Sequence, residues 1–242
     1  MISKGQIKLI TSLQQKKYRD KTGLFIAEGP KVIQELVASG VRLHSLFSTE
    51  TFEDASVTTT IITAAELQKI SALTTANTAL AVFEKPEQTV PHYEGLTVAL
   101  DAIRDPGNLG TIIRLCDWFG IQHLICSTDT ADCYNPKVVQ ATMGSLARVT
   151  VSYVDLKEFL QNAEVPIYGA MLQGTNVYTA QMPTNAILVM GNESRGVSEA
   201  IQQQLTHRLT IPQFGTSKDT ESLNVATATA ILVSEFRRAT GR

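Results

Sequence analysis

Three clusters of glycines and polar residues in the second half of the chain have the residue types that a ligand site needs. The first, "DPGNLGTIIR" (residues 105–114), joins an expected strand to an expected helix and can present backbone amides to an anion. Within it, Asn108 is a candidate helix cap. Arg114 stands between two apolar residues of the helix. Its guanidinium is either solvent-facing or buried beside an anionic partner, and this motif alone supports both interpretations.

The second and third clusters also follow expected strands. "VMGNESRGVS" (189–198) contains glycines that permit positive φ or close approach of the backbone to a ligand; alternatively it is a polar loop that caps a helix through Ser198. In "LTIPQFGTSKDTESLNVATATA" (209–230), a strand ends in Ile-Pro and a glycine-containing loop follows, and Ser222 and Asn224 then mark the start of an Ala-rich C-terminal helix. Ligands of open α/β sheets bind at the carboxyl ends of strands, so all three clusters are candidate site segments.

Apolar runs alternate with helical patterns along the whole chain, which predicts an α/β fold with a mixed or parallel sheet. In the first third, the patterns predict strands at 23–29, 43–49 and 78–84 and helices at 3–14, 30–39 and 64–73. In the remainder they predict strands at 96–101, 123–127, 148–154, 166–172, 186–191 and 207–212, and helices at 108–120, 135–146, 155–163 and from Ser222 onward.

Residues 84–95, "EKPEQTVPHYEG", interrupt this alternation with two prolines, a glycine and four charged residues. Such a composition is typical of an interdomain linker. We therefore expect a small N-terminal α/β domain at residues 1–88, a linker at 89–95 and a larger α/β domain at 96–242.

The composition is that of a soluble globular protein, with 43% hydrophobic and 18% charged residues. No apolar run approaches the roughly 18 residues that span a bilayer, and the N-terminus lacks the pattern of a secretory signal, so we expect a cytoplasmic protein without a membrane partner. The three cysteines form no CxxC pair and the four histidines have no ligand spacing. Reduced thiols and no metal are expected.

The charge distribution is uneven although the net charge is only −2. Residues 1–31 contain seven lysines and arginines against two acidic residues, a local balance of +5. This segment can attract phosphates, as RNA-binding surfaces do, or it can be a solvated basic helix, and composition alone favours the second interpretation slightly.

In order and context, the three clusters resemble motifs 1, 2 and 3 of the SpoU (TrmH) family within the SPOUT superfamily of RNA methyltransferases. The matching elements are "DPGNLGTIIR", "VMGNESRGVS" and "ESLNVATATAI" preceded by Ile211-Pro212. The N-terminal stretch from Ser12 to Gly40 is similar to the L30e-like substrate-binding domain that precedes many SpoU catalytic domains. The resemblance covers nearly the whole chain.

The resemblance implies a function that composition and periodicity do not reveal. It implies S-adenosylmethionine as the cofactor and methylation of a ribose 2′-hydroxyl in RNA, with ribosomal RNA favoured over transfer RNA. It also implies a homodimer and a trefoil knot formed by the C-terminal segment, a SPOUT α/β-knot.

Residue by residue, the family's polar active-site positions fall on Asn108, Arg114, Glu193, Ser222 and Asn224. The cofactor pocket falls on Met190, Gly191, Ile211, Leu223 and Asn224, and the RNA-binding candidates are Lys16, Lys17, Arg19 and Arg114. Family analogy gives Arg114 the role of base. Because a guanidinium is normally always protonated, we expect it instead to grip the adjacent phosphate.

The chain departs from the family pattern in two places. The loop "QFGTSKDTE" (213–221) is about three residues longer than usual, and "ANTA" (76–79) replaces a Pro-Gln-Gly-like turn. Two other functions of the chain are rival interpretations. One is an RNA-binding homologue that has lost catalysis. The other is a Rossmann-type nucleotide enzyme, which the lack of G-x-G-x-x-G and phosphate-loop motifs disfavours.

Overall fold

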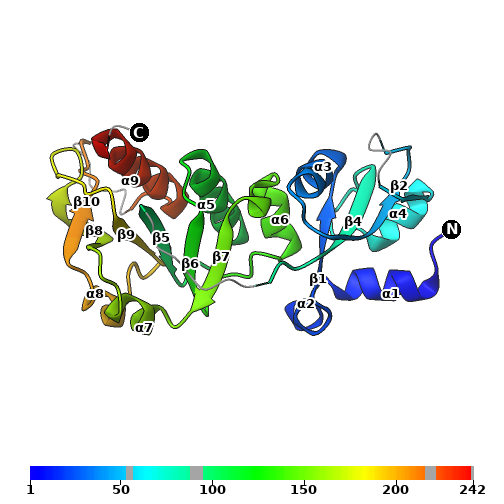
Figure 1. Ribbon diagram of the computed structural model, residues 1–242, viewed down its shortest axis with the longest axis horizontal. Coiled ribbons are helices and arrows are strands. Elements are labelled where there is room, and N and C mark those ends of the chain that lie inside the picture. The colour runs from blue at the N-terminus through cyan, green and yellow to red at the C-terminus, as the bar shows by residue number, and fades with distance from the viewer. Residues whose placement is uncertain (53–56, 88–94, 216–221, 241–242) are drawn as a thin grey trace. The chain divides into compact units, whose positions relative to one another are not determined.

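The computed structural model describes residues 1–52, 57–87, 95–215 and 222–240, and the chain forms two compact units (Figure 1). The first unit contains residues 1–88 together with residues 132–148, and the second contains residues 89–131 and 149–242. The expected linker at 89–95 lies almost wholly outside the described residues. The assignment of residues 132–148 to the first unit is a feature that the sequence analysis did not anticipate.

A four-stranded sheet with the order β1-β4-β2-β3 forms the centre of the first unit. Strand β4 is antiparallel to β1 and β2, whereas β3 is parallel to β2. The short strand β3 was not predicted, because three residues are too few to establish an alternating pattern. The strands are β1 (Leu24–Glu28), β2 (Leu43–Ser48), β3 (Thr59–Ile61) and β4 (Ala79–Glu84).

Helices of the first unit begin where the sequence supplies caps. The Ser3 and Thr63 hydroxyls each start a helix through a capping box with a residue three positions later. The helix expected at 3–14 is α1, which ends at Ser12, and the second helix, which starts at Lys16, was not predicted. The helices are α1 (Lys4–Ser12), α2 (Lys16–Thr22), α3 (Pro30–Ala38) and α4 (Ala64–Ile70).

Residues 132–148 pack on the β1 and α3 side of the first unit. They form α6 (Pro136–Thr142), which contacts β1, and the 3-10 helix η1 (Ser145–Ala147), which contacts α3. The ring of Tyr134 lies 4.9 Å from the ring of Phe25, centroid to centroid. Gly144 has φ +96°, and a Cβ there would lie 2.6 Å from the Cβ of Glu35, so only glycine fits this contact.

The second unit is built on a six-stranded sheet with the order β10-β8-β9-β5-β6-β7, in which every pairing between described neighbours is parallel. The expected α/β class with a parallel sheet is therefore confirmed. The strands are β5 (Leu96–Asp101), β6 (His123–Ser127), β7 (Thr150–Val154), β8 (Ile167–Asn176), β9 (Ala186–Gly191) and β10 (His207–Thr210).

Helices cover both faces of this sheet, with α5 and α9 on one side and α7 and α8 on the other (Figure 1). The α7 and α8 side has a core that includes Ala99, Ile125 and Val189. Since neighbouring residues of a strand face opposite sides, Met190 points toward the α5 and α9 side. The helices are α5 (Pro106–Trp118), α7 (Leu156–Gln161), α8 (Glu199–Gln202) and α9 (Val225–Thr240).

All three cysteines are buried, and none forms a disulfide in the described part of the chain. Burial raises the pKa of the Cys116 thiol to about 12, so this thiol is not a nucleophile at neutral pH. In the part of the chain that the structure describes, no helix combines the length and apolar character needed to cross a bilayer.

Candidate active site

The ends of β5 and β9 bring the first two motif clusters together. Asp101 and Gly191, the last residues of these parallel strands, are paired in register. The backbone N–H of Ser198 donates to Asp101 Oδ2 at 2.6 Å, and Asn192 Nδ2 donates to the Ala102 carbonyl at 2.7 Å. The segment after β9 is therefore held against the segment after β5 by hydrogen bonds to both.

Helix α5 begins at Pro106, two residues before the start predicted at 108. Asp105 is its N-cap, with a side chain that accepts from the Asn108 backbone N–H at 2.8 Å, and Pro106 occupies the first helical position. Asn108 is therefore not the cap. Its side chain is free to take part in other contacts because the aspartate three residues earlier does the capping.

The freed amide of Asn108 connects all three clusters. Its Nδ2 donates to Glu193 Oε1 at 3.1 Å, and its Oδ1 accepts from Asn224 Nδ2 at 2.9 Å. Glu193 Oε1 also accepts from the Asp105 N–H at 3.4 Å. The result is an exposed chain of polar side chains that runs Glu193, Asn108, Asn224, with one member from each motif.

Asn224 has two roles at once. Its Oδ1 accepts from the backbone N–H groups of Ala226 and Thr227 at 2.9 and 3.2 Å, which caps α9, while its Nδ2 reaches Asn108. Ser222, two residues earlier, is exposed and adjoins residues 216–221, which lie outside the described residues. Most of the longer loop at 213–221 therefore also lies outside them.

The residues expected to hold the cofactor lie after β9 and β10 and before α9. Met190 is buried and Ile211 is half-buried, whereas the large apolar side chain of Leu223 is 49% exposed. A Cβ at Gly191 would lie 2.1 Å from the backbone N of Val197, so this glycine is required by the loop that folds back over it. The exposed side chain of Leu223 is a surface that the apolar edge of a ligand could cover.

A cleft of about 610 Å³ opens at the carboxyl ends of β5, β6 and β9. Its floor is the end of β5, and its walls come from the start of α5, the loop after β6 and the loop after β9. The lining residues are Asp101, Ala102, Arg104, Asp105, Asp129, Asn192, Glu193, Ser194, Arg195, Gly196 and Ser198. Because Asp105 and Glu193 line it, the cleft adjoins the chain of polar side chains.

Comparison with known families and relatives decides between the interpretations of this site. Residues 95–234 match the SpoU rRNA Methylase family, and residues 4–81 match the MRM3-like substrate binding domain. The chain belongs to the SpoU family. This membership excludes the alternative interpretation as a Rossmann-type nucleotide enzyme.

Relatives support the assignment over the full length. The 23S rRNA (guanosine(2553)-2′-O)-methyltransferase RlmP of Bacillus subtilis is 31% identical over 93% of each chain. A TrmH-family RNA methyltransferase structure from Porphyromonas gingivalis is 43% identical, with a TM-score of 0.89 over 98% of this chain and 99% of that one. An AdoMet-bound rRNA methyltransferase from Sinorhizobium meliloti is 29% identical, with a TM-score of 0.86 over 98% and 97%.

The SpoU motif-1 arginine, Arg114, is exposed on α5 between the buried residues Ile113 and Cys116. Of the two interpretations of the Arg114 guanidinium, the structure of the single chain therefore supports the solvent-facing one. The described residues offer it no ion-pair partner. Trp118, one turn further along the same helix, is 85% exposed, so both side chains lie on one open face of α5.

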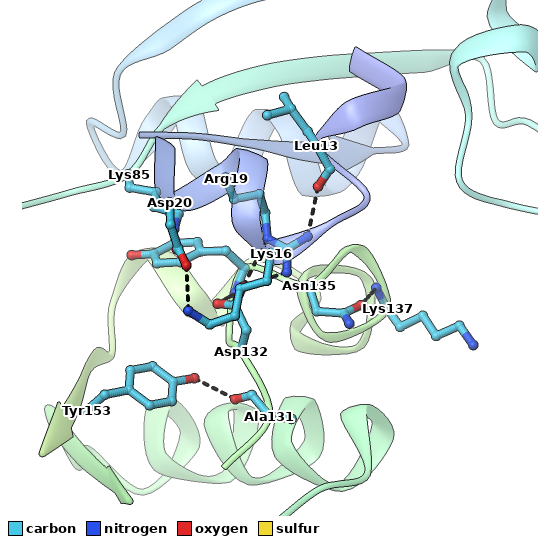
Figure 2. A network of polar contacts seen from close by, with 11 residues as sticks. Leu13, Lys16, Arg19, Asp20, Lys85, Ala131, Asp132, Asn135, Lys137 and Tyr153 are labelled. Atoms are coloured by element: carbon cyan, nitrogen blue, oxygen red, sulfur yellow. Dashed lines mark hydrogen bonds and ion pairs between the residues drawn. The ribbon is translucent and has the colours of Figure 1, made fainter. Parts of the chain in front are cut away.

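Arg19 is not at the surface, contrary to the expectation that it binds RNA. Its side chain is 2% exposed, and Nη2 lies 2.6 Å from Asp132 Oδ2 (Figure 2). Nε donates to the same carboxylate at 2.9 Å and Nη1 donates to the Leu13 carbonyl at 2.8 Å. A buried guanidinium without its partner would be costly, so this pair holds residues 132–148 on the first unit.

The other two RNA-binding candidates lie on α2. Lys16 is 64% exposed and pairs with Asp20 at 2.6 Å, and the ammonium of Lys17 lies 4.8 Å from the centre of the Tyr18 ring. Lys85 also pairs with Asp20, at 2.8 Å (Figure 2). Part of the positive charge of residues 1–31 is thus neutralised within the unit, and Lys16 and Lys17 remain accessible.

The sequence analysis missed two groups in the second unit. Asp105 could have been found, because Asp105-Pro106 has the same cap-then-proline pattern as Asn135-Pro136, which starts α6. Arg104 and Asp129 of the cleft carried no local signal. They come from different strand ends, and only the parallel pairing of β5 with β6 brings their loops to the same edge.

Proposed function

We propose that this protein transfers a methyl group from S-adenosylmethionine to a ribose 2′-hydroxyl of ribosomal RNA. The observation that carries the proposal is the hydrogen-bonded chain Glu193, Asn108, Asn224, which joins the three SpoU motifs at one edge of the sheet. A substrate of this class places the enzyme in the compartment that contains ribosomes, which we take to be the cytoplasm.

The residues after β9 and β10 suit the cofactor. Gly191 and its neighbours offer backbone groups, Met190 and Ile211 offer apolar surface, and Leu223 is the exposed apolar side chain that adenine could cover. When bound, S-adenosylmethionine supplies a methyl group on a positively charged sulfur. We assign Met190, Gly191, Ile211, Leu223 and Asn224 to its binding.

The polar chain orients the substrate. Holding the 2′-oxygen in line with the reacting methyl group can supply about 7–11 kcal/mol of the barrier in favourable cases. Asn108 and Asn224 fix each other's amides, and Glu193 fixes Asn108, so Glu193 organises the site in preference to acting as the base. Ser222, two residues before Asn224, is assigned to the same ribose site.

Arg114 is the candidate for binding the phosphate beside the target ribose. It is exposed, permanently charged and free of an ion pair with any described residue. Its guanidinium does not accept a proton, so the proton of the 2′-hydroxyl leaves to another group or to water. On the first unit, Lys16 and Lys17 supply accessible positive charge for the RNA backbone.

The experiment uses the full-length protein, labelled S-adenosylmethionine and an unmodified transcript of the large-subunit rRNA. We expect methyl incorporation, with 2′-O-methylated nucleosides after digestion. Arg114→Ala should abolish transfer while the calorimetric affinity for S-adenosylmethionine stays within about threefold. Loss of cofactor binding in that variant would refute the role of Arg114. An RNA-binding protein without catalysis would bind no S-adenosylmethionine and label no transcript.

The family's homodimer and trefoil knot belong to the same proposal. The open face of α5 with Arg114 and Trp118 supports a dimer, because an 85% exposed tryptophan is costly to leave in water. Light scattering of the wild type and of Trp118→Glu tests it. We expect a dimer that the substitution converts to a monomer, whereas a wild-type monomer would contradict the dimer.

A further inference from the structure

The cleft beside the proposed ribose site has charged groups that the reaction itself does not use. Of its carboxylates, Asp101 accepts from the Ser198 N–H, Asp105 caps α5, and Glu193 accepts from Asn108. Each of these three is therefore occupied by a structural contact within the unit. Asp129 is the fourth carboxylate of the cleft: its Oδ1 accepts from the Ser127 hydroxyl, and its Oδ2 faces the more distant guanidinium of Arg104.

Asp129 faces Arg104 across the cleft in a loose pair. Arg104 Nη2 lies 3.7 Å from Asp129 Oδ2, and the two side chains are 66% and 54% exposed. This distance is longer than that of a hydrogen-bonded ion pair, which is about 2.7–2.9 Å. Each group therefore keeps hydrogen-bonding capacity that an incoming ligand can use.

Buried hydroxyl groups nevertheless hold the Asp129 carboxylate in place. The buried hydroxyl of Ser127 donates to Asp129 Oδ1 at 2.7 Å and accepts from the Ala102 N–H at 2.8 Å. A second buried hydroxyl, that of Thr130, lies 3.0 Å from the Ser127 hydroxyl, and the Ala131 N–H donates to the Ile103 carbonyl at 2.8 Å. These hydrogen bonds connect the loop after β6 to the segment after β5. They also fix the position of the Asp129 carboxylate.

A carboxylate beside a guanidinium selects among the four bases by hydrogen bonding. Proteins read unpaired RNA bases through their Watson–Crick edges. Guanine has two adjacent donors on that edge, N1–H and the N2 amino group, and an acceptor next to them, O6. A carboxylate accepts from both donors, and an arginine donates to the acceptor. Adenine, cytosine and uracil do not have two adjacent donors followed by an acceptor.

We propose that Arg104 and Asp129 form the base-recognition subsite of this enzyme and that the methylated nucleotide is a guanosine. The inference rests on the proposed function, since it assumes that a nucleotide is bound with its ribose at Asn108 and Glu193. Arg104 directly precedes Asp105, the cap of α5, so the base and ribose subsites adjoin along one strand end.

The test identifies which nucleoside carries the new methyl group. The full-length enzyme is incubated with the unmodified large-subunit rRNA transcript and labelled S-adenosylmethionine, and the digested RNA is separated by mass spectrometry. We expect label in 2′-O-methylguanosine. Once the position is mapped, an oligonucleotide with inosine at that position, which lacks the N2 amino group, should show a kcat/KM roughly 10- to 100-fold lower.

Substitutions assign the effect to the subsite. Asp129→Ala should lower kcat/KM for guanosine by a similar factor and make guanosine and inosine equal substrates, with little change in cofactor affinity. If this variant folds poorly, Asp129→Asn gives the same comparison, because an amide cannot accept from both donors. Glu164→Ala removes an exposed acidic residue just before β8, at the opposite end of the strands, and should behave as the wild type.

The outcomes separate this inference from the function on which it rests. If no nucleoside is methylated and no S-adenosylmethionine binds, the proposed function fails. If methylation occurs on uridine, cytidine or adenosine, the function stands and guanosine recognition is refuted. If guanosine is methylated but Asp129→Ala still prefers guanosine over inosine as strongly as the wild type does, Asp129 does not read the base.

Discussion

Asn108 on α5 donates a 3.1 Å hydrogen bond to Glu193, which lies in the loop after β9. The same amide accepts from Asn224 at the start of α9. One side chain therefore couples three parts of the chain that are far apart in sequence, and its environment depends on Asp105 capping α5.

Replacing Asn108 with alanine should separate the three motifs without unfolding α5. The helix start is kept because Asp105 accepts from the backbone N–H of residue 108 and not from its side chain. Loss of a hydrogen bond to a charged group predicts a kcat/KM roughly 10- to 100-fold lower, with nearly unchanged S-adenosylmethionine affinity. Asn162→Ala, on the end of α7, is the matched control, and equal activity of the two variants would contradict the role of Asn108.

The role of Glu193 is tested by comparing two substitutions. Glutamine keeps an oxygen that can accept from Asn108 Nδ2, whereas alanine keeps none. An organising role predicts that Glu193→Gln retains activity within roughly tenfold of the wild type, while Glu193→Ala loses at least about 100-fold. Steady-state methyl transfer measures both. Equal inactivity of the two variants, with both folded, would point to a role for Glu193 as the base.

The pair formed by Arg19 and Asp132 should stabilise the first unit. Arg19→Met leaves the Asp132 carboxylate, which is only 10% exposed, without its partner, and such a change costs about 3–5 kcal/mol. Denaturant unfolding and hydrogen exchange of the β1 amides would measure the loss. Lys16→Met, which removes an exposed pair, should cost less than about 1 kcal/mol. Equal effects of the two substitutions would be inconsistent with a buried structural pair.

The stability of the first unit should depend on pH through Asp20. Hydrogen bonds from Lys16, which has the larger effect, and from Lys85 lower the pKa of Asp20 from 3.8 to about 2. A carboxyl group whose pKa is lowered by folding stabilises the protein above its unfolded pKa, and this contribution is lost as the pH falls from about 4 to about 2. Because Asp20 is 46% exposed, the contribution at neutral pH is at most about 1 kcal/mol.

Asp20→Asn isolates this contribution. The difference in unfolding free energy between the wild type and this variant should be constant from pH 7 to about pH 5 and should shrink below pH 4. Thermal unfolding at a series of pH values provides the measurement. A difference that stays the same down to pH 2.5 would mean that the Lys16 and Lys85 contacts do not hold the carboxylate in its charged form.

Elements with strong local signals were predictable from sequence. The run "LTVALD" is buried along its whole length and forms β5 over the predicted residues. Asn135 caps α6 and Pro136 starts it, as their types predict. In each case the deciding interactions lie within a few residues of one another, so they are visible in a short window of sequence.

Features that depend on distant partners were not predictable. Arg19 lies in a basic segment that looks like a phosphate-binding surface, but the residue that buries it is 113 positions away. The local sequence around Asn108 suggested a helix cap, and only the family resemblance placed Asn108 at the active site, because the contacts of its amide are with the distant residues Glu193 and Asn224. The cleft pair Arg104 and Asp129 likewise exists only once β5 and β6 lie side by side. Hydrophobic periodicity carries no information about such pairs.

The membership of residues 132–148 in the first unit limits how this protein could be recombined with its relatives. A chimaera made by exchanging residues 1–88 alone would separate Phe25 from the Tyr134 ring and Arg19 from Asp132. It would also leave the apolar side of α6, with Val138 and Val139, facing a foreign surface. Grafting a new RNA specificity onto this scaffold therefore requires moving two separate pieces of the gene together. Substitutions in residues 1–88 and in residues 132–148 constrain one another, because the two segments are packed in one unit.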